Sequence, residues 1–296
     1  MGALDGKVVI VTGAGQGIGR EEALACARAG ARVVVDDLRG ADETAAAIGD
    51  EGGEALPLDL DVGDFDAAGR LVAAAVERFG GLDGLVNNAG VVRDRMVFNL
   101  SPVEFDLVLR VYLRGTFCTT RHASAWWKRT GRPGAIVNTT STSGILGNLG
   151  QANYGAAKAG VAAFTVITAL ELARYGVRVN ALAPGARTQM TEGAFGDLTF
   201  PGRFDPLDPA NVAPVAVWLL SDAAGETSGQ VLGITGGLLE LYQGWQVAAS
   251  QDAGGRWTVE ALTEAAPRLF GDRPVRAPWR QSSMRRLIQS ARDGRD

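Results

Sequence analysis

Short runs of apolar, mostly β-branched residues recur along the first 240 residues of the chain. Several of these runs are apolar at every position, whereas a strand with one face in water alternates apolar and polar residues. Continuous apolar runs are typical of strands that are covered on both faces of a parallel sheet. The runs that predict strands are Lys7 to Thr12, Arg32 to Asp36, Leu56 to Leu60, Gly84 to Asn87, Ala135 to Thr139, Val177 to Leu182 and Val231 to Ile234.

Between these runs, apolar residues recur with the period of an amphipathic helix. Strands and helices that alternate this regularly favour right-handed βαβ crossovers. We therefore predict the α/β class, with a doubly wound parallel seven-stranded sheet flanked by helices. The predicted helices include Gly17 to Ala29, Phe65 to Phe79, Pro102 to Lys128, Ala152 to Tyr175 and Pro209 to Leu220.

The character of the chain changes after Gly237. Residues 241–296 hold nine arginines, six acidic residues and no lysine, a net charge of +3 in a chain whose total is −4. They also contain Trp245, Trp257 and Trp279, which is more aromatic surface than a solvated tail needs. We expect a catalytic domain over residues 1–240 and a C-terminal extension over 241–296 that packs on the core or on a neighbouring subunit. The alternative is a partly disordered arginine-rich end, which is at least as good an interpretation of the last ten residues.

The overall composition narrows the function classes. A net charge of −4 gives no dominant basic surface, so we expect no nucleic-acid partner. The two cysteines, Cys26 and Cys118, provide neither a disulfide framework nor a cysteine-based zinc site, and we expect no metal. The N-terminus lacks the pattern of a signal peptide, and the longest apolar stretch, Ala159 to Leu170, is short for a membrane span. We expect a cytoplasmic protein without a membrane partner.

A glycine-rich turn, TGAGQGIG, runs from Thr12 to Gly19 between the first predicted strand and helix. Glycine is needed here because a tight turn requires backbone angles that side chains disfavour, and because phosphate oxygens must approach the main chain closely. The helix that follows presents unpaired N–H groups and a positive dipole end to a pyrophosphate. The candidate dinucleotide-binding residues in this turn are Gly13, Gln16, Gly17, Ile18 and Gly19.

An acidic residue, Asp37, follows the second predicted strand, directly after Asp36 and before Leu38. A carboxylate at this place accepts hydrogen bonds from the ribose hydroxyls of adenosine and repels a 2′-phosphate. The neutral Gln16 also offers no positive charge to that phosphate. We therefore predict NAD(H), rather than NADP(H), as the cofactor; the alternative for the two aspartates is a solvated turn.

Tyr154 and Lys158 stand four residues apart in a predicted helix. With four tyrosines and three lysines in the chain, chance gives this spacing an expected count of roughly 0.04. Residues i and i+4 share a helix face, and a nearby ammonium favours the phenolate, so the tyrosine becomes a usable general base. Ser141 lies just after the strand that ends at Thr139, where the carboxyl ends of parallel strands open onto a ligand crevice.

These motifs, together with Asn87-Asn88-Ala89-Gly90 and Pro184-Gly185, resemble the short-chain dehydrogenases/reductases over residues 5 to about 240. The resemblance implies a Rossmann-type fold and places the catalytic roles on three residues. Ser141 would polarise the carbonyl or alcohol, Tyr154 would transfer the proton, and Lys158 would bind the nicotinamide ribose and lower the tyrosine pKa. Besides Tyr154 and Lys158, it implies further cofactor contacts at Asp37, Leu38, Asp61, Val62, Asn88, Ala89, Gly90, Pro184, Gly185 and Thr188.

One position departs from the family pattern. Many members carry an asparagine in a Val-Asn-Leu-x-Gly context on the long central helix, and this chain has Tyr112 there. In the family, that asparagine's main-chain carbonyl is thought to hold a relay water. Tyr112 is therefore a modified relay position or a residue of the core or an interface, and both interpretations stay open.

Within the family, the chain is most similar to the (3R)-hydroxyacyl-CoA dehydrogenase domain of the peroxisomal multifunctional enzyme type 2 and to bacterial hydroxyacyl-CoA and hydroxysteroid dehydrogenases. The similarity lies in the Gly147 to Tyr154 stretch, in Asp36 to Leu38, in Leu113 to Gly115 and in Val212 to Leu219. The segment from Gln189 to Asp208 stands where the family has its substrate lid. Its Phe195, Phe200 and Phe204 would form an apolar wall or only secure the loop, and Arg187 or Arg203 would meet a CoA phosphate.

The leading hypothesis is an NAD-dependent oxidoreductase that interconverts a secondary alcohol and a ketone by hydride transfer, on a 3-hydroxyacyl-CoA or a hydroxysteroid. The alternatives are a reductase of quinones, sugars or polyketide ketones, and an NAD(H)-binding scaffold or sensor without catalysis. The helix from Ala152 to Tyr175 is apolar on more than one face, so we also expect a homodimer or homotetramer. His122 and the two cysteines are interpreted as packing or interface residues.

Overall fold

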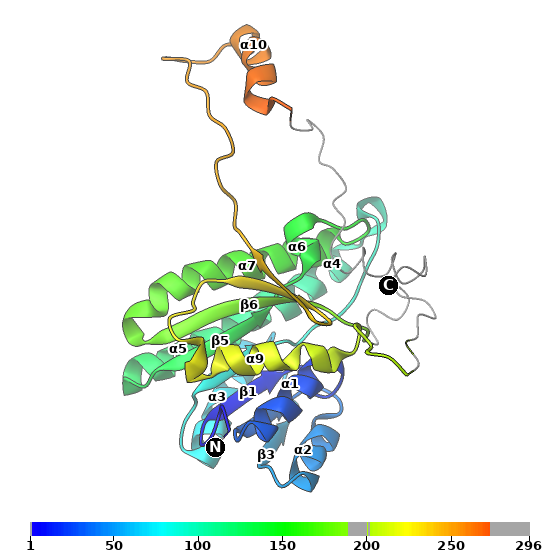
Figure 1. Cartoon of the computed structure of the whole chain (residues 1–296), viewed down its shortest axis with the longest axis vertical. Helices are drawn as coiled ribbons and strands as arrows, with labels where there is room; N and C mark the ends of the chain where they lie inside the picture. Colours follow the sequence, from blue (N-terminus) through cyan, green and yellow to red (C-terminus); the bar gives the residue numbers. More distant parts are fainter. Residues whose placement is uncertain (1, 189–199, 201, 273–296) are drawn as a thin grey trace. The chain divides into compact units, whose positions relative to one another are not determined.

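The computed structural model describes residues 2–188, 200 and 202–272. Within them, eight strands form one sheet in the order β3-β2-β1-β4-β5-β6-β7-β8, and Figure 1 shows helices on both sides of it. The first seven strands pair in parallel, which confirms the predicted fold class. The strands are β1 (Val8–Thr12), β2 (Arg32–Asp36), β3 (Ala55–Leu58), β4 (Gly84–Asn87), β5 (Gly134–Thr139), β6 (Val177–Gly185), β7 (Val231–Thr235) and β8 (Leu238–Tyr242).

The eighth strand is a feature that the hydrophobic pattern did not predict. It pairs antiparallel with β7, and Thr235 lies opposite Leu238 across the two-residue loop Gly236-Gly237. Gly236 has a φ of +57°, which a side chain disfavours, so glycine permits the tight hairpin. The strand carries leucines in place of β-branched residues, and for this reason it lacked the signal of the other seven.

The helices confirm the five predicted helical segments and divide one of them. The stretch from Pro102 to Lys128 is interrupted by a π-helical turn, Arg110–Arg114, which carries Tyr112. A widened turn of this kind changes the direction of side chains without ending the helix. The helices are α1 (Gly17–Arg28), α2 (Ala41–Asp50), α3 (Phe65–Phe79), α4 (Pro102–Leu109), α5 (Gly115–Thr130), α6 (Thr142–Leu146), α7 (Ala152–Leu172), α9 (Ala213–Leu220) and α10 (Val259–Phe270).

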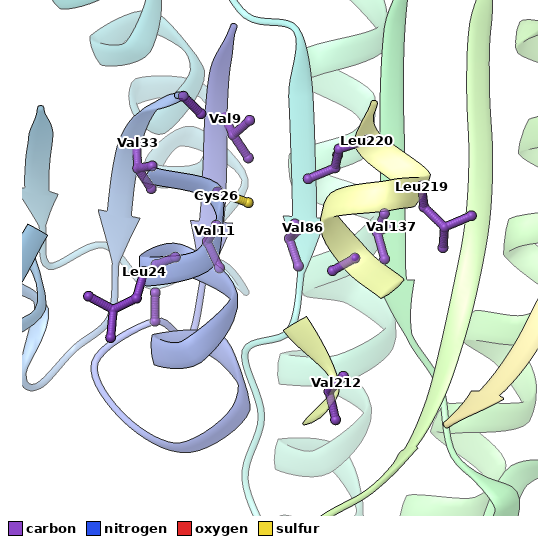
Figure 2. Packing of buried hydrophobic residues seen from close by; sticks show 14 of the residues in the cluster. Val9, Val11, Leu24, Cys26, Val33, Val86, Val137, Val212, Leu219 and Leu220 are labelled. Atoms are coloured by element: carbon purple, nitrogen blue, oxygen red, sulfur yellow. The ribbon is translucent and has the colours of Figure 1, made fainter. Parts of the chain in front are cut away.

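Two hydrophobic layers cover the two faces of the sheet. One lies between the sheet and the helices α1, α2 and α9, and Figure 2 shows Leu24 of α1 and Leu219 of α9 among the valines of the strands. The other lies beneath α3, α5 and α7, around the fully buried Trp127. Because both faces are covered, the strands are apolar throughout, as the sequence pattern indicated.

The order of the strands fixes where a ligand crevice opens. β1 and β4 are neighbours in the sheet, and Thr12 at the end of β1 pairs with Asn87 at the end of β4. The chain leaves β1 toward β2 on one side and leaves β4 toward β5 on the other. In a doubly wound sheet, such a switch point opens a crevice at the carboxyl ends of the strands. The glycine-rich turn and the Asn88-Ala89-Gly90 segment both begin there.

The apolar segment that contains α7 is longer than the stretch from Ala159 to Leu170 that the sequence analysis considered. Ala152–Tyr175 is long and apolar enough to cross a membrane by length and composition, with a mean hydropathy of 1.5. The uninterrupted apolar run is shorter because Lys158, Glu171 and Arg174 lie within the longer segment. The core helix of a soluble protein passes the same test, and α7 packs here against α6 and β6.

The chain divides after Tyr242 into two compact units, and the smaller one begins at Gln243. Among its described residues it contains α10, whose N-terminus is capped by the Thr258 hydroxyl accepting from Ala261 N. Trp245 is fully exposed, and Trp279 lies outside the described residues. The expected packing of the C-terminal extension on the core or on another subunit stays a prediction.

Both cysteines are buried free thiols. In the described part of the chain, no group of three or more His, Cys, Asp and Glu residues is placed to hold a metal ion. The expected cytoplasmic location stays a prediction.

Candidate active site

The glycine-rich turn and the segment after β4 lie against each other at the end of the sheet. The Thr12 hydroxyl accepts hydrogen bonds from the backbone N–H groups of Asn88 (3.1 Å) and Ala89 (3.3 Å). Gly13 has a φ of +66°, and a Cβ there would stand only 2.6 Å from the Ala89 Cα. A glycine is therefore required at position 13 by both conformation and space.

The start of α1 is open toward the cavity. Its N-cap residue, Gln16, makes no side-chain cap hydrogen bond, and the first turn contains no acidic residue. The first backbone N–H groups of a helix lack intrahelical partners and carry a partial positive charge, so this end fits a phosphate group. Gly19 does not line the cavity; a Cβ there would collide with the Gly13 carbonyl, so Gly19 allows the close packing of helix and turn.

Asp37 lies at the end of β2, with its carboxylate next to the glycine-rich turn. Its Oδ2 accepts from Gly15 N at 3.0 Å, and its Oδ1 accepts from Arg39 N at 3.1 Å. Each carboxylate oxygen can accept more than one hydrogen bond, so the group keeps acceptor capacity for ribose hydroxyls. Its neighbour Asp36 points into the protein and accepts from Leu60 N, and burial raises the pKa of Asp36 to about 8.

Ser141, Tyr154 and Lys158 meet at the other end of the same cavity. Ser141 follows β5 and caps α6, while α7 carries Tyr154 and Lys158 on one face. The Thr140 hydroxyl donates to the Lys158 carbonyl at 2.6 Å, which ties α7 to the end of β5. The three residues predicted to be catalytic are thus brought together.

Burial shifts the titration of both ionisable members of this group. It raises the pKa of Tyr154, and the hydrogen bond from the Ser141 hydroxyl partly offsets that rise. Burial also lowers the pKa of Lys158 to about 7. The charged forms of phenol and amine are both unfavourable in an apolar setting, so their ionisation depends on what else contacts them.

Tyr112 is buried beside these residues. Its ring centroid lies 4.0 Å from the Lys158 Nζ and 5.3 Å from the centroid of the Tyr154 ring, which it meets edge to face. Burial raises the pKa of the Tyr112 phenol well above its ordinary value. A Cβ at Gly90 would overlap the Tyr112 ring, so the glycine of the Asn88-Ala89-Gly90 segment leaves room for it.

A polar rim at the substrate end was missed by the sequence reasoning. The Gln151 side chain donates to Asp94 Oδ2 at 2.6 Å, and its oxygen accepts from Ser143 Oγ and Asn148 Nδ2. Asp94 and Gln151 are 57 positions apart, so no local pattern could pair them. Gln151 and Asn148 lie in the stretch that carried the family resemblance, which was the available signal.

One cavity of about 430 Å³ joins the two ends and collects most of the predicted residues. Gly19 and Gly185 are not in its lining; Gly185 ends β6 and is buried. The predicted residues that line the cavity are Gly13, Gln16, Gly17, Ile18, Asp37, Leu38, Asp61, Val62, Asn88, Ala89, Gly90, Ser141, Tyr154, Lys158, Pro184 and Thr188. Others that line it, besides the rim residues, include Val91, Val92, Arg93, Tyr112, Thr139, Thr140 and Ala186.

The predicted substrate lid is described only in part. Residues 189–199, which include Phe195, lie outside the described residues. Phe204 is exposed. Arg187, considered as a contact for a CoA phosphate, instead pairs with Asp205 at 3.3 Å and does not line the cavity. His122 contacts the Phe65 carbonyl at 2.9 Å through Nε2, outside the cavity lining, in keeping with a structural role.

The chain is similar to known proteins in both sequence and structure. The family model described as short chain dehydrogenase matches residues 7–197. The hydroxyacyl-CoA dehydrogenase ChsB1 of Mycobacterium tuberculosis is 42% identical over 287 residues, covering 91% of this chain and 90% of that protein. The peroxisomal multifunctional enzyme type 2 of Mus musculus is 39% identical over 252 residues, covering 81% of this chain but 32% of that protein. A short chain dehydrogenase from Mycobacterium avium has a crystal structure with a TM-score of 0.86 and 45% identity, covering 95% of this chain and 100% of that chain.

Proposed function

Because the chain belongs to the short-chain dehydrogenase family, we propose that it is an NAD-dependent oxidoreductase that interconverts a secondary alcohol and a ketone. Members of this family bind nicotinamide cofactors and act on CH–OH and keto groups of small molecules. The observation that carries the proposal is a cavity of about 430 Å³ with an open helix N-terminus and a carboxylate at one end and Ser141, Tyr154 and Lys158 at the other. An anionic dinucleotide matches the first end, and proton transfer to a substrate oxygen matches the second.

The chain's own residues then handle the proton and the substrate oxygen. In alcohol oxidation, Tyr154 accepts the hydroxyl proton of the substrate while the Ser141 hydroxyl holds the substrate oxygen; in ketone reduction, the same phenol returns the proton. Lys158 stabilises the phenolate form through its positive charge. The bound nicotinamide supplies or takes up the hydride. The serine hydrogen bond and the lysine charge both act on the Tyr154 oxygen, which makes that oxygen the centre of the mechanism.

The preference for NAD over NADP is proposed from Asp37 and Gln16. The Asp37 carboxylate would accept hydrogen bonds from the adenosine ribose and repel a phosphate on it. Gln16 is exposed at the start of α1 and carries no charge for such a phosphate. Leu38 is exposed beside Asp37 and offers an apolar contact for an adenine ring.

The substrate class is proposed from the exposed apolar side chains that neighbour the polar rim in the sequence, and from the relatives. Exposed apolar side chains flank the bridge between Arg95 and Gln151 in the sequence: Met96, Val97 and Phe98 on one side and Leu149 on the other. None of these four side chains lines the cavity, but an apolar surface next to the polar rim in the sequence would suit an acyl chain or fused rings better than a sugar. Together with relatives named for hydroxyacyl-CoA and multifunctional peroxisomal enzymes, this favours a 3-hydroxyacyl-CoA, with a hydroxysteroid as the second candidate.

A panel of oxidations tests the proposal. The protein is incubated with NAD or NADP and with 3-hydroxyacyl-CoA esters of increasing chain length, hydroxysteroids or sugar alcohols, and in the reverse direction with NADH or NADPH and quinones, and NAD(P)H absorbance is followed. We expect turnover with NAD, strongest on acyl-CoA esters. Turnover only on sugars or quinones would refute the substrate class. NADH binding without any turnover would instead support a scaffold or sensor.

We also propose that the protein forms a dimer or tetramer. Large apolar side chains are exposed in the single chain at Val166, Ile167 and Leu170 on α7 and at Phe117 on α5. Light scattering after size exclusion gives the mass directly. A monomer at micromolar concentration would contradict this proposal without affecting the catalytic one.

A further inference from the structure

The ammonium of Lys158 is buried, with only 2% of the residue exposed. One N–H donates to the Thr139 carbonyl at 2.5 Å. The nearest aromatic face belongs to Tyr112, 4.0 Å from Nζ, whereas the centroid of the Tyr154 ring is 5.7 Å away. The lysine therefore lies closer to the centre of the Tyr112 ring, which departs from the family pattern, than to the centre of the Tyr154 ring.

Several features of the chain hold the Tyr112 ring in this place. The π-helical turn Arg110–Arg114 carries it, and Val108 and Ala157 enclose it in a small buried cluster. The Val91 backbone N–H donates to its phenol oxygen, so the hydroxyl is used in anchoring the ring. Gly90 provides the space that the ring occupies.

We propose that Tyr112 is a positioning residue that holds the Lys158 ammonium against the face of its ring. A cation within about 6 Å of an aromatic face is attracted by the ring quadrupole, and more strongly when water is excluded. The ring thereby offsets part of the cost of burying the ammonium and fixes its place beside Tyr154. The active component is the ring face, and the hydroxyl only anchors it. The effect on catalysis rests on the proposed function. The contact between the Tyr112 ring and the Lys158 ammonium does not, because it involves only residues of this chain.

The proposal predicts how Lys158 titrates. At the catalytic end of the cavity, the other titratable or charged side chains in the lining are Tyr154 on the same helix, Tyr112 on the π-helical turn, and Arg93 and Asp94 on the segment after β4. Burial, and to a smaller extent the negative charge of Asp94, raises the pKa of both tyrosines, so both stay neutral near pH 7. The ring face of Tyr112 then favours protonated Lys158, and burial opposes it. Removing the ring should lower the Lys158 pKa.

The first experiment measures Lys158 directly in the protein without cofactor. The chain has three lysines, Lys7, Lys128 and Lys158, so ¹³C-labelled lysine gives three signals, assigned with a Lys158→Met variant. Tyr112→Phe keeps the ring and removes the hydroxyl, while Tyr112→Leu removes both. We expect the Lys158 midpoint to stay within about 0.3 pH unit in Tyr112→Phe and to fall by about 0.5 to 1.5 units in Tyr112→Leu.

The second experiment measures catalysis. The acid limb of kcat/KM for alcohol oxidation should move to higher pH in Tyr112→Leu, because a less protonated Lys158 stabilises the Tyr154 phenolate less. Tyr112→Phe should keep the position of the limb, even where loss of the Val91 contact lowers Tm. Tyr175→Leu is the matched control, because Tyr175 also lies beside a cation, Lys128 at 5.9 Å, but does not line the cavity.

Equal Lys158 midpoints in Tyr112→Phe and Tyr112→Leu would overturn the proposal, whether both variants keep the wild-type midpoint or both shift from it. A wild-type protein that turns over no secondary alcohol would refute the proposed function instead. In that case the lysine titration still decides whether the ring holds the ammonium, so the two failures are distinguishable.

Discussion

The two ends of the cavity differ in which atoms they present to a ligand. At the glycine-rich end, these are backbone N–H groups and the carboxylate of Asp37, on residues that are partly exposed. At the catalytic end, they are side chains of Ser141, Tyr154 and Lys158, two of which are buried. Backbone groups tolerate changes in neighbouring side chains, whereas a buried side chain has no substitute. Mutations should therefore alter cofactor choice at one end and abolish turnover at the other.

The same contrast holds for the polar groups beneath each end. Below the catalytic end, Asn87 Nδ2 donates to Asn138 Oδ1 at 2.8 Å, and Asn138 Nδ2 donates to Thr165 Oγ1 at 2.9 Å. Thr119 donates to Asn87 Oδ1 at 2.6 Å, so the nitrogen and the oxygen of each amide have a hydrogen-bond partner within the core. Below the glycine-rich end, Glu22 of α1 is completely buried, and neither of its carboxyl oxygens has a hydrogen-bond partner. The asparagine network therefore stabilises the catalytic end. The unpartnered Glu22 carboxyl instead makes burial of that part of α1 less favourable.

Tyr154→Phe should produce the largest effect. It removes the single atom through which the proton moves, so kcat should fall by about 10³-fold. The change leaves the glycine-rich end intact, and NADH should bind as tightly as to the wild type, as measured by nicotinamide fluorescence. A matched control is Tyr175→Phe, outside the cavity lining, which should keep full turnover. Loss of NADH binding in Tyr154→Phe would mean that the two ends are not separable.

Asn138→Leu should mainly reduce stability. The substitution keeps the volume but removes the acceptor of one N–H of the buried Asn87 amide, whose other N–H still bonds the Thr120 hydroxyl. An unsatisfied buried donor makes the free energy of unfolding fall by about 3 kcal/mol, as urea denaturation would measure. Thr168→Val on α7, the helix that also carries Thr165 of the network, is the control, because the Thr168 hydroxyl bonds only carbonyls of its own helix. An equal loss in both variants would contradict the importance of the network.

Glu22→Gln should change how stability depends on pH. Burial raises the pKa of Glu22 to about 8, whereas an ordinary glutamate titrates near 4.5. Between these values the folded protein keeps a proton that the unfolded chain has released, so the free energy of unfolding falls as the pH rises through this window. This titration is worth about 4 to 5 kcal/mol at pH 9. The variant lacks it, but its buried glutamine amide has no partner and offsets part of the gain, so the variant should exceed the wild type by about 2 kcal/mol at pH 9.

The measurement is urea denaturation of the protein without cofactor at pH 5 and pH 9. A residual decline should persist in the variant because Asp36, with its pKa also raised to about 8, acts in the same direction. Glu21→Gln serves as the control, since Glu21 is partly exposed and paired with Arg20. An unchanged pH dependence in Glu22→Gln would show that the Glu22 carboxyl finds a partner in solution.

The sequence predicted those parts of the site that depend on local pattern. The strands followed from continuous β-branched runs, and the Tyr154–Lys158 pair followed from helical spacing. The contact between Tyr112 and Lys158 was not predictable, because it joins residues from two helical segments and depends on the π-helical turn. The role of Asp94 was missed because its partner, Gln151, is 57 positions away in the sequence. Periodicity reports which face of an element is buried, but it carries no information on which distant side chain meets it.

Asp37→Ala should give the smallest of these effects. It removes the carboxylate that favours the ribose hydroxyls of NAD and repels a 2′-phosphate, while Gly15 N and Arg39 N are close enough to the surface to bond water instead. The ratio of the dissociation constants for NADPH and NADH should fall by about tenfold, or 1.4 kcal/mol. The control is Asp42→Ala, which removes the same charge from the exposed first turn of α2, outside the cavity lining. An equal fall in both variants would assign cofactor choice to the general field of this end, and an unchanged ratio in Asp37→Ala would refute the role of its carboxylate.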